Sequence, residues 1–283
     1  MKRIISYSLW GNEPMYTIGA IRNAEMSPKV FPEWTCRFYL GSDVSIDIVN
    51  KLKSFGHTEV FVMENKPNDW QGMFWRFYPI NTEEDIDIMI SRDTDSRLSN
   101  REALAVEEWI NSGRNLHIMR DHPYHSEAIM GGMWGCRPKE LLKDLKKELK
   151  LDNLNSIEQV IELWMISEWE KTQNNEVRSL KPNQYHSKGI DQRFLGDFIY
   201  KMMVEDALIH DDHMHFTNKK HLLQPTKPFP SKIELNEQGI YDFVGQVYDE
   251  NDMPNKEYSE TYQWGMNAML TRQFSSLLGQ KHG

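Results

Sequence analysis

The chain has 283 residues, of which 39% are hydrophobic and 27% charged, and its formal net charge is −9. This composition excludes a disordered, collagenous or disulfide-stapled chain, and the acidic balance argues against a protein that mainly binds nucleic-acid phosphates. No run approaches the roughly 18 apolar residues of a membrane span. The two cysteines, Cys36 and Cys136, are expected to be buried thiols in a reducing compartment. We therefore expect a soluble, cytoplasmic globular protein without a transmembrane segment.

Strand-like and helix-like segments alternate over the first 120 residues. Strands are expected at 4–9, 35–40, 59–63, 86–90 and 115–119, with helices at 13–26, 43–55 and 100–112. Parallel strands need crossover connections, which are usually helices. This alternation therefore predicts an α/β fold with a mostly parallel central sheet flanked by helices.

The second half of the chain has a different pattern. Helices are expected at 140–150, 157–169 and 191–203, and a late strand at 243–247 within an otherwise irregular segment. No internal repeat or linker separates the halves. We predict a single domain over 1–283, with a helical insertion at about 140–185.

The strongest chemical signal is the sequence Arg92-Asp93-Thr94-Asp95, directly after the apolar end of the fourth expected strand. Open α/β sheets bind ligands outside the carboxyl ends of their strands. Two carboxylates one residue apart can hold a hard divalent cation, and the cation can bind a diphosphate. The alternative is an Asp-rich turn whose charge is balanced by Arg92 and Arg97. We favour the metal site.

Four further stretches accompany this pair in a fixed order. Together the five stretches are Ser8-Leu9-Trp10-Gly11, Trp75-Arg76-Phe77, 92–97, 131–135 and 189–195. In this order they resemble the glycosyltransferases of the GT-A fold that use nucleotide sugars, especially the small enzymes of capsular-polysaccharide loci and of large algal viruses.

The resemblance implies that the two halves of the chain bind different parts of the substrates. Residues 1–120 would form the nucleotide-binding half, and residues 121–283 the half for the sugar and the acceptor. It further implies Mn²⁺ or Mg²⁺ as cofactor, a nucleotide-diphosphate sugar as donor, and a glycan or another saccharide as acceptor. The expected role is polysaccharide biosynthesis.

The nucleotide-sugar contacts are expected mainly from the first half. A glycine at a strand end lets the backbone approach a nucleotide, and an aromatic ring offers a face for its base. Core packing is an equal alternative for Tyr7 and Trp10, and Arg76 pairs either a diphosphate, Asp93 or a surface carboxylate. The candidates from this half are Tyr7, Ser8, Trp10, Gly11, Arg76, Arg92 and Asp93.

A glycine-rich stretch, 130–135, follows the fifth expected strand. At Gly132 the backbone can pass close to a sugar, and Trp134 can stack on a pyranose face. We therefore add both residues to the nucleotide-sugar contacts. The alternative is a structural turn with Trp134 in the core.

Asp191 and Gln192 open a helix after Gly189. Side-chain oxygens and free N–H groups at a helix start can bind a hydroxylated sugar. The Asp-Gln pair resembles that of the retaining, glycogenin-like enzymes, which implies that Asp191 orients the donor sugar and that the anomeric configuration is retained. Asp191 and Gln192 are therefore the catalytic candidates, with an ordinary N-cap as the alternative.

The segment 210–215 contains three histidines. Many families of the GT-A fold add a late histidine to the metal site, and an N/O donor set suits Mn²⁺. We predict that His210 joins Asp93 and Asp95 as the third metal ligand, with His213 as second choice. Surface histidines without a metal are the alternative.

Two other functions are compatible with the same residues. A metal-dependent phosphohydrolase could use the two aspartates with the late histidines, although two-metal phosphoesterases need more such motifs than this chain contains. A catalytically silent sugar-binding protein is the other alternative. We favour the metal-dependent glycosyltransferase.

Overall fold

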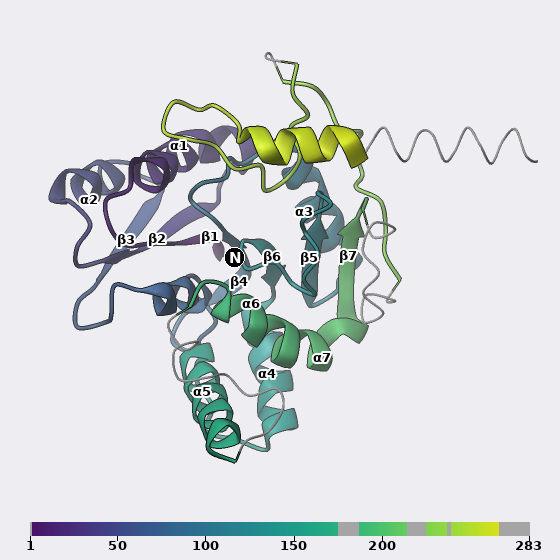
Figure 1. The fold of residues 1–283 in the computed structure, drawn as a ribbon. Coiled ribbons are helices and arrows are strands. Elements are labelled where there is room, and N and C mark those ends of the chain that lie inside the picture. Colours follow the sequence, from purple (N-terminus) through teal and green to yellow (C-terminus); the bar gives the residue numbers. More distant parts are fainter. Residues whose placement is uncertain (1, 175–186, 214–224, 237–238, 266–283) are drawn as a thin grey trace, which may run out of the picture.

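A computed structural model describes residues 2–174, 187–213, 225–236 and 239–265 (Figure 1). One seven-stranded sheet forms its centre, in the order β3-β2-β1-β4-β6-β5-β7. The strands are β1 (Lys2–Leu9), β2 (Thr35–Gly41), β3 (Thr58–Met63), β4 (Ile86–Arg92), β5 (Leu116–Arg120), β6 (Met133–Cys136) and β7 (Ala207–Asp211). Neighbouring strands run parallel, except that β6 is antiparallel to both β4 and β5. The predicted α/β fold with a mostly parallel sheet is confirmed.

Helices connect the strands and cover both faces of the sheet (Figure 1). The α-helices are α1 (Pro14–Val30), α2 (Ile46–Lys53), α3 (Asn100–Ser112), α4 (Pro138–Leu149), α5 (Ile157–Gln173), α6 (Ile190–Phe194) and α7 (Tyr200–Met203). Two 3₁₀-helices, η1 (Trp70–Phe77) and η4 (Val204–Asp206), a π turn, η3 (Leu195–Ile199), and a helix at 256–265 are also described. The predicted helices are present, α3 with its predicted bounds and the others with shifted ends, and the one expected at 191–203 is divided by the π turn.

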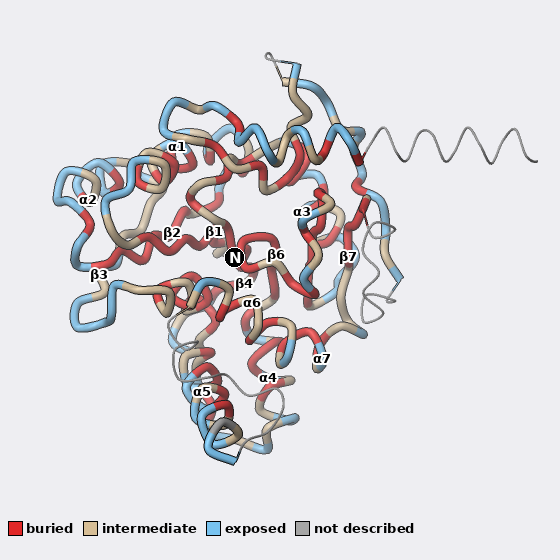
Figure 2. Tube along the Cα trace, viewed as in Figure 1, coloured by how far each residue is buried: buried red, intermediate tan, exposed pale blue. Residues whose placement is uncertain are grey.

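Two apolar cores lie on the two faces of the sheet. Successive residues of a strand point to opposite faces, so Ile4 packs into the core beneath α4 and α5, whereas Ile5 packs into the core beneath α1 to α3. The same alternation separates Met89 from Ile90 in β4. Figure 2 shows the strands as the most continuously buried part of the chain. The sheet is therefore a rigid platform for side chains at its carboxyl edge.

The sequence analysis was wrong about three strand assignments. β6 was expected as part of a glycine-rich loop, but its four residues are wedged between β4 and β5 and are all buried. β7 was not expected because His210 and Asp211 interrupt its apolar run; both are buried against polar partners. The late strand at 243–247 is absent from the described residues, where Val247 makes only an isolated bridge to Ser96.

The C-terminal part of the described chain returns to the carboxyl edge of the sheet. Residues 256–265 form a helix (yellow in Figure 1), and the segment before it crosses the loop that follows β4. There the N–H of Tyr248 donates to the carbonyl of Asp95 at 2.8 Å. This segment therefore covers the loop that carries the Asp-Thr-Asp sequence.

Along the chain, α4 and α5 follow β6 and precede α6, where the helical insertion was predicted. The predicted end of the insertion, at 175–185, lies outside the described residues. The division of one domain into two halves near residue 120 stays a prediction. Cys36 and Cys136 are both buried and free, as expected.

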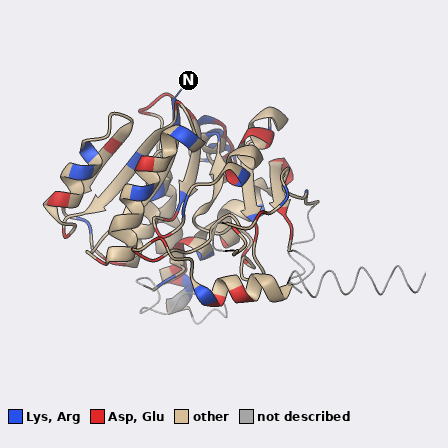
Figure 3. Ribbon diagram, turned by 90° about the horizontal axis from the view of Figure 1, so that it is seen from above, with Lys and Arg blue, Asp and Glu red and all other residues tan. Residues whose placement is uncertain are grey.

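Charges of both signs are interspersed along the outer helices (Figure 3). This mixed surface differs from the basic stripe of nucleic-acid-binding proteins. Among the described helices, none has the length and apolar character needed to cross a bilayer.

Candidate functional site

A cavity of about 400 Å³ opens at the carboxyl ends of β1 and β4. This is the edge at which open α/β sheets bind ligands. The loop after β4 lies between two groups of lining residues, one from the end of β1 and η1, the other from the chain around β5 and β6. The predicted site residues that line the cavity are Ser8, Trp10, Gly11, Arg76, Asp93, Asp95, Gly132 and Gln192.

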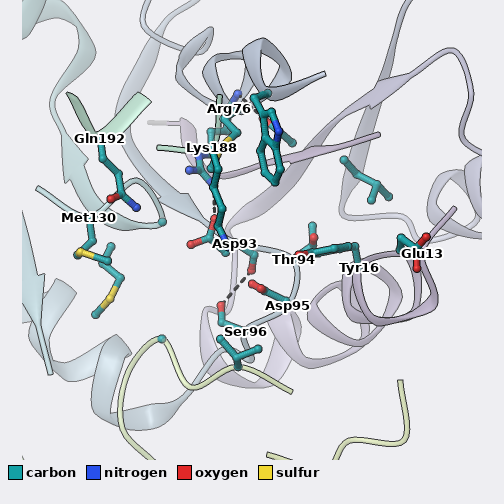
Figure 4. Close-up of a pocket in the computed structure, with 18 of the residues that line it drawn as sticks. Glu13, Tyr16, Arg76, Asp93, Thr94, Asp95, Ser96, Met130, Lys188 and Gln192 are labelled. Atoms are coloured by element: carbon teal, nitrogen blue, oxygen red, sulfur yellow. Dashed lines mark hydrogen bonds and ion pairs between the residues drawn. The ribbon is translucent and has the colours of Figure 1, made fainter. Parts of the chain in front are cut away.

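The Asp-Thr-Asp loop presents two carboxylates side by side (Figure 4). The Asp93 side chain is 43% exposed, so a ligand in the cavity can reach it. Burial and the neighbouring Asp93 carboxylate raise the pKa of Asp95 well above its ordinary value. Because burial and an adjacent carboxylate disfavour the ionised form of Asp95, a cation bound there is favourable.

The donor set fits a hard divalent cation. Asp93 and Asp95 supply carboxylate oxygens, the ligands that Mg²⁺ and Mn²⁺ prefer. No cluster of three or more His, Cys, Asp or Glu side chains with metal-site geometry occurs in the described part of the chain. A cation held by this pair would complete its shell with water and with the oxygens of a diphosphate.

Arg76 connects the Asp loop to α6. Its guanidinium donates to Asp93 from one nitrogen and to Asp191 from another, the latter at 2.6 Å. Its backbone N–H donates to the Ser8 hydroxyl at 2.8 Å, which fixes η1 to the end of β1. Burial by itself lowers the pKa of Arg76, but the two carboxylates outweigh burial and keep the group charged. Arg76 is therefore a buried cation shared by two acids.

Asp191 lies behind Arg76 and does not line the cavity. It is fully buried in the first turn of α6, and burial raises its pKa although Arg76 opposes the shift. Its Oδ2 accepts from Arg76, while its Oδ1 has no partner among the described residues. Gln192, the next residue, does line the cavity. Of the two predicted catalytic residues, Asp191 is thus buried behind Arg76 and Gln192 lies at the cavity.

Two consecutive glycines are required by this ion-paired cluster. A Cβ at Gly132 would overlap the carboxylate of Asp93, and a Cβ at Gly131 would overlap Asp191 and Arg76. The carbonyl of Gly131 accepts from the Ser91 hydroxyl at 2.8 Å, which holds the loop in this close position. Gly132 was predicted because the backbone must approach a sugar; the structure gives a second reason, the contact with Asp93.

Tryptophans form one wall of the cavity. Trp10 packs edge-on against Trp70 and Trp75, with ring centroids 5.7 and 6.4 Å apart. Gly72 leaves room for the Trp10 ring, because a Cβ there would lie 2.8 Å from it. Gly11 has φ +72°, a conformation that glycine adopts at low cost, and its N–H donates to Asp43 at 3.0 Å. Trp70 was missed because it follows a polar, strand-free segment with no recognisable motif.

Three of the residues predicted to contact the nucleotide sugar have side chains buried away from the cavity. Tyr7 is fully buried and stacks on Phe38 at 4.8 Å. Trp134 is fully buried in β6 and packs edge-on against Phe77, so it offers no face to a sugar. Arg92 is buried and ion-paired with Glu102. The residues that follow Tyr7 and Arg92 in the chain, Ser8 and Asp93, do line the cavity.

The two histidines predicted as the third metal ligand lie away from the Asp pair. His210 lies in β7, which is separated from β4 by β6 and β5. Its Nδ1 lies 2.8 Å from the Nε2 of His117, and its Nε2 lies 3.1 Å from Glu108. His213, the second choice, is buried and packs against Tyr262 at 4.9 Å. Neither histidine lines the cavity, and the third histidine of the cluster, at position 215, lies outside the described residues.

Several lining residues had no signal in the sequence analysis. Tyr16, from α1, reaches the Asp pair, and burial followed by the charges of Asp95 and Asp93 raises its pKa. Lys188 lies close enough to Asp95 to oppose the rise in that carboxyl's pKa. Figure 4 shows Tyr16 on one side of the Asp pair and Gln192 on the other. These residues converge through the fold alone.

Comparison with known proteins gives partial overlaps only. No family model and no curated protein matches the chain. One similar solved structure is residues 1–349 of TarS from S. aureus, with 12% identity, a TM-score of 0.38, and coverage of 52% of this chain and 49% of that chain. Another is glucosyl-3-phosphoglycerate synthase from Mycobacterium tuberculosis, with 15% identity, a TM-score of 0.34, and coverage of 50% and 59%.

A complex of the latter enzyme with Mn²⁺, UDP-glucose and glycerol 3-phosphate also matches, with 16% identity, a TM-score of 0.33, and coverage of 50% of this chain and 58% of that chain. The chain thus spans about half the length of these structures.

Proposed function

We propose that the protein is a metal-dependent glycosyltransferase that moves a sugar from a nucleotide-diphosphate sugar to a hydroxyl group of a saccharide. The observation that carries this proposal is the Asp93-Thr94-Asp95 loop at the carboxyl end of β4, with both carboxylates at a cavity of about 400 Å³. Ligand cavities in proteins range from about 300 to 1,000 Å³. The volume therefore suits a ligand of nucleotide-sugar size.

The donor's nucleotide is assigned to the tryptophan wall. Trp10 and Trp70 present ring surface on the β1 side of the Asp pair, where a base can pack. The diphosphate would then lie at Asp93 and Asp95. A divalent cation held by these two carboxylates would neutralise the charge that develops on the leaving diphosphate.

Arg76 and Asp191 act as positioning residues in this proposal. Arg76 holds the Asp93 carboxylate from behind, and Asp191 holds Arg76. Removal of Arg76 would leave the buried Asp191 carboxylate without a counter-charge, and removal of Asp191 would leave Arg76 with Asp93 alone. The pair therefore fixes the orientation of Asp93. Gln192, at the cavity surface, is proposed to donate to and accept from the sugar hydroxyls.

We further propose that the reaction retains the anomeric configuration. An inverting enzyme needs a base within about 3 Å of the acceptor hydroxyl. The ion pair of Asp191 with Arg76 supports an orienting role for Asp191 rather than the role of that base. Proton NMR of the freshly formed glycoside tests this directly, because a product with inverted configuration contradicts it.

A panel of nucleotide sugars with Mn²⁺ tests the activity itself. We expect release of nucleotide diphosphate, dependent on metal and abolished in Asp95→Asn, a variant that keeps the size of the side chain. Phosphate release from simple phosphoesters would instead indicate a phosphohydrolase. Sugar binding without any release would indicate a silent binding protein. Full activity of Asp95→Asn in the presence of EDTA would refute the proposed metal site.

A further inference from the structure

The cavity has a second wall beyond the Asp pair. β4 lies between β1 on one side and β6 and β5 on the other, so the tryptophans and the chain around β5 and β6 face each other across Asp93 and Asp95. The residues that we call the second wall are Tyr124, His125, Met130, Met133 and Tyr258. With the nucleotide assigned to the tryptophan side, the second wall is where a second substrate would lie.

A hydrogen bond to His125 fixes which of its ring nitrogens carries the proton. The backbone N–H of Asp121 donates to its Nδ1 at 3.1 Å, so in the neutral ring the proton is on Nε2. Burial, followed by the nearby His122, lowers the pKa of His125 well below its ordinary value, so the ring is neutral at pH 7.

The Cε1–Nε2 edge of His125 lies beside Gly245, another lining residue with φ +83°. A Cβ at Gly245 would lie 3.2 Å from Cε1 and 3.4 Å from Nε2. Among the described residues the hydrogen bond of the His125 ring is made at Nδ1, so Nε2–H is available to a ligand in the cavity.

Two tyrosines lie next to this donor, and the backbones of both are hydrogen-bonded to one histidine. The rings of Tyr124 and Tyr258 are nearly perpendicular, with centroids 5.5 Å apart. His122 accepts from the N–H of Tyr124 at 3.0 Å and donates to the carbonyl of Tyr258 at 2.8 Å. The loop after β5 and the helix at 256–265 are therefore joined, and their aromatic surfaces are preorganised. Aromatic surface beside a single donor suits a sugar ring, which has apolar C–H faces and hydroxyl edges.

The charge on this wall favours an uncharged partner. None of its five residues is charged when His125 is neutral, and the carboxylates of Asp93, Asp95 and Glu257 act on its tyrosines. A phosphate or carboxylate placed there would lose its hydration without a cation in the wall itself, because the cations that line the cavity, Lys188 and Arg76, lie toward Asp95 and Asp93.

We propose that the second wall binds an uncharged saccharide acceptor, with Nε2–H of His125 donating to one of its hydroxyls and the rings of Tyr124 and Tyr258 packing on its C–H faces. This assignment rests on the proposed function. It names the chemical class of the acceptor and the residues that select it.

The test uses the full chain with Mn²⁺ and the nucleotide sugar that it cleaves best. Methyl glycosides of neutral hexoses are compared with hexose 6-phosphates and hexuronic acids, and release of nucleotide diphosphate is measured with and without each. We expect the neutral glycosides to accelerate release at least tenfold over the hydrolysis seen without acceptor. Acceleration by the anionic sugars alone would overturn the acceptor assignment and leave the transferase proposal standing. No donor cleavage with any partner, water included, would refute both.

His125→Asn separates the donor from its structural support. The Asn oxygen can still accept from Asp121 N–H, whereas the group that faces the cavity is lost. We expect the acceptor KM to rise about fivefold relative to the donor KM, the effect of one lost hydrogen bond. The matched control is His57→Asn, whose ring bonds to the carbonyl of Ala24 away from the cavity. Equal changes in the two KM values of His125→Asn would contradict its role as an acceptor contact.

Discussion

Asn23, in the middle of α1, donates from Nδ2 to the carbonyl of Ser96 at 2.8 Å, so an amide on a distant helix holds the loop that carries the two aspartates. Its Oδ1 accepts from the N–H of Leu98 at 3.1 Å. The helix can approach this closely because residue 19 is glycine, where a Cβ would overlap the carbonyl of Thr94. The Asn23 side chain is buried, and its amide holds the loop at Ser96 and Leu98.

We predict that Asn23→Ala weakens both the fold and the metal site. The substitution leaves the buried N–H of Leu98 without a partner and leaves Arg97 as the other donor to the Ser96 carbonyl, which costs about 1–3 kcal/mol of unfolding free energy. The affinity for Mn²⁺ should fall about tenfold, because Asp93 and Asp95 are no longer held together. Urea unfolding and titration with Mn²⁺ measure the two effects.

The control for Asn23→Ala is Thr17→Val, on the same helix. The Thr17 hydroxyl bonds only to carbonyls within and just before α1, both at 3.3 Å, so Mn²⁺ affinity should be unchanged. An Asn23→Ala protein that is less stable but binds Mn²⁺ normally would show that the amide supports the fold and not the site.

Gly132→Ala should abolish donor turnover in a folded protein. The added methyl group would overlap the Asp93 carboxylate and displace it from its pairing with Arg76. We expect a loss of more than a hundredfold in kcat/KM for the donor and weaker Mn²⁺ binding. Gly196→Ala is the matched control, because its Cβ would lie 3.7 Å from Ala128, an ordinary contact. Comparable activity of the two variants would contradict the role assigned to Gly132.

The strands β1 to β5 could be predicted because each is mainly an apolar run that ends at polar residues or glycine. β6 could not, since four residues beside three glycines resemble a loop; only its insertion between β4 and β5 makes it a strand. β7 was hidden by two buried polar residues, His210 and Asp211. The partners that satisfy them, His117 and Arg120, are distant in sequence.

The candidate site was predictable where it depends on one strand end and not where it depends on packing. Asp93 and Asp95 follow an apolar strand, and this local pattern places them at the sheet edge. Tyr7 and Trp134 are equally close to strand ends, but sequence alone does not show which aromatic ring the core takes. His122 and Tyr258 come together only because the C-terminal segment folds back, and no local pattern predicts that contact.

Acid should weaken an ion-pair cluster that lies at the end of the sheet opposite the cavity. Arg37 is buried in β2 and pairs with both Glu59 and Glu84 at 2.6 Å. The hydrogen bond from Arg37 lowers the pKa of Glu84 to about 2, against a partly opposing effect of burial. Because the folded-state pKa is depressed, the contribution of Glu84 is complete above its unfolded pKa of about 4.3 and is lost as the pH falls toward 2.

Glu84→Gln should therefore lower the unfolding free energy at pH 7 by about 1 kcal/mol, a modest value because the Glu84 carboxylate is partly exposed to solvent. The difference from the wild type should shrink between pH 4.5 and pH 2. Urea unfolding at a series of pH values measures it, with Glu83→Gln as a control at the neighbouring position. A difference that does not depend on pH would mean that the lost interaction is not ionic.

Arg76 and Asp191 should behave as a coupled pair in stability but not in activity. Arg76→Met leaves the Asp191 carboxylate buried without a counter-charge, which costs about 3–5 kcal/mol of unfolding free energy. Asp191→Asn removes that charge, so the double variant should be more stable than Arg76→Met alone. Activity should not recover with it, because Asp93 has still lost the guanidinium that holds it. Chemical unfolding and donor turnover of the wild type, both single variants and the double variant complete the cycle. If donor turnover returned together with stability, Arg76 would serve only to neutralise Asp191, and the orientation of Asp93 would have to come from the loop and the bound cation.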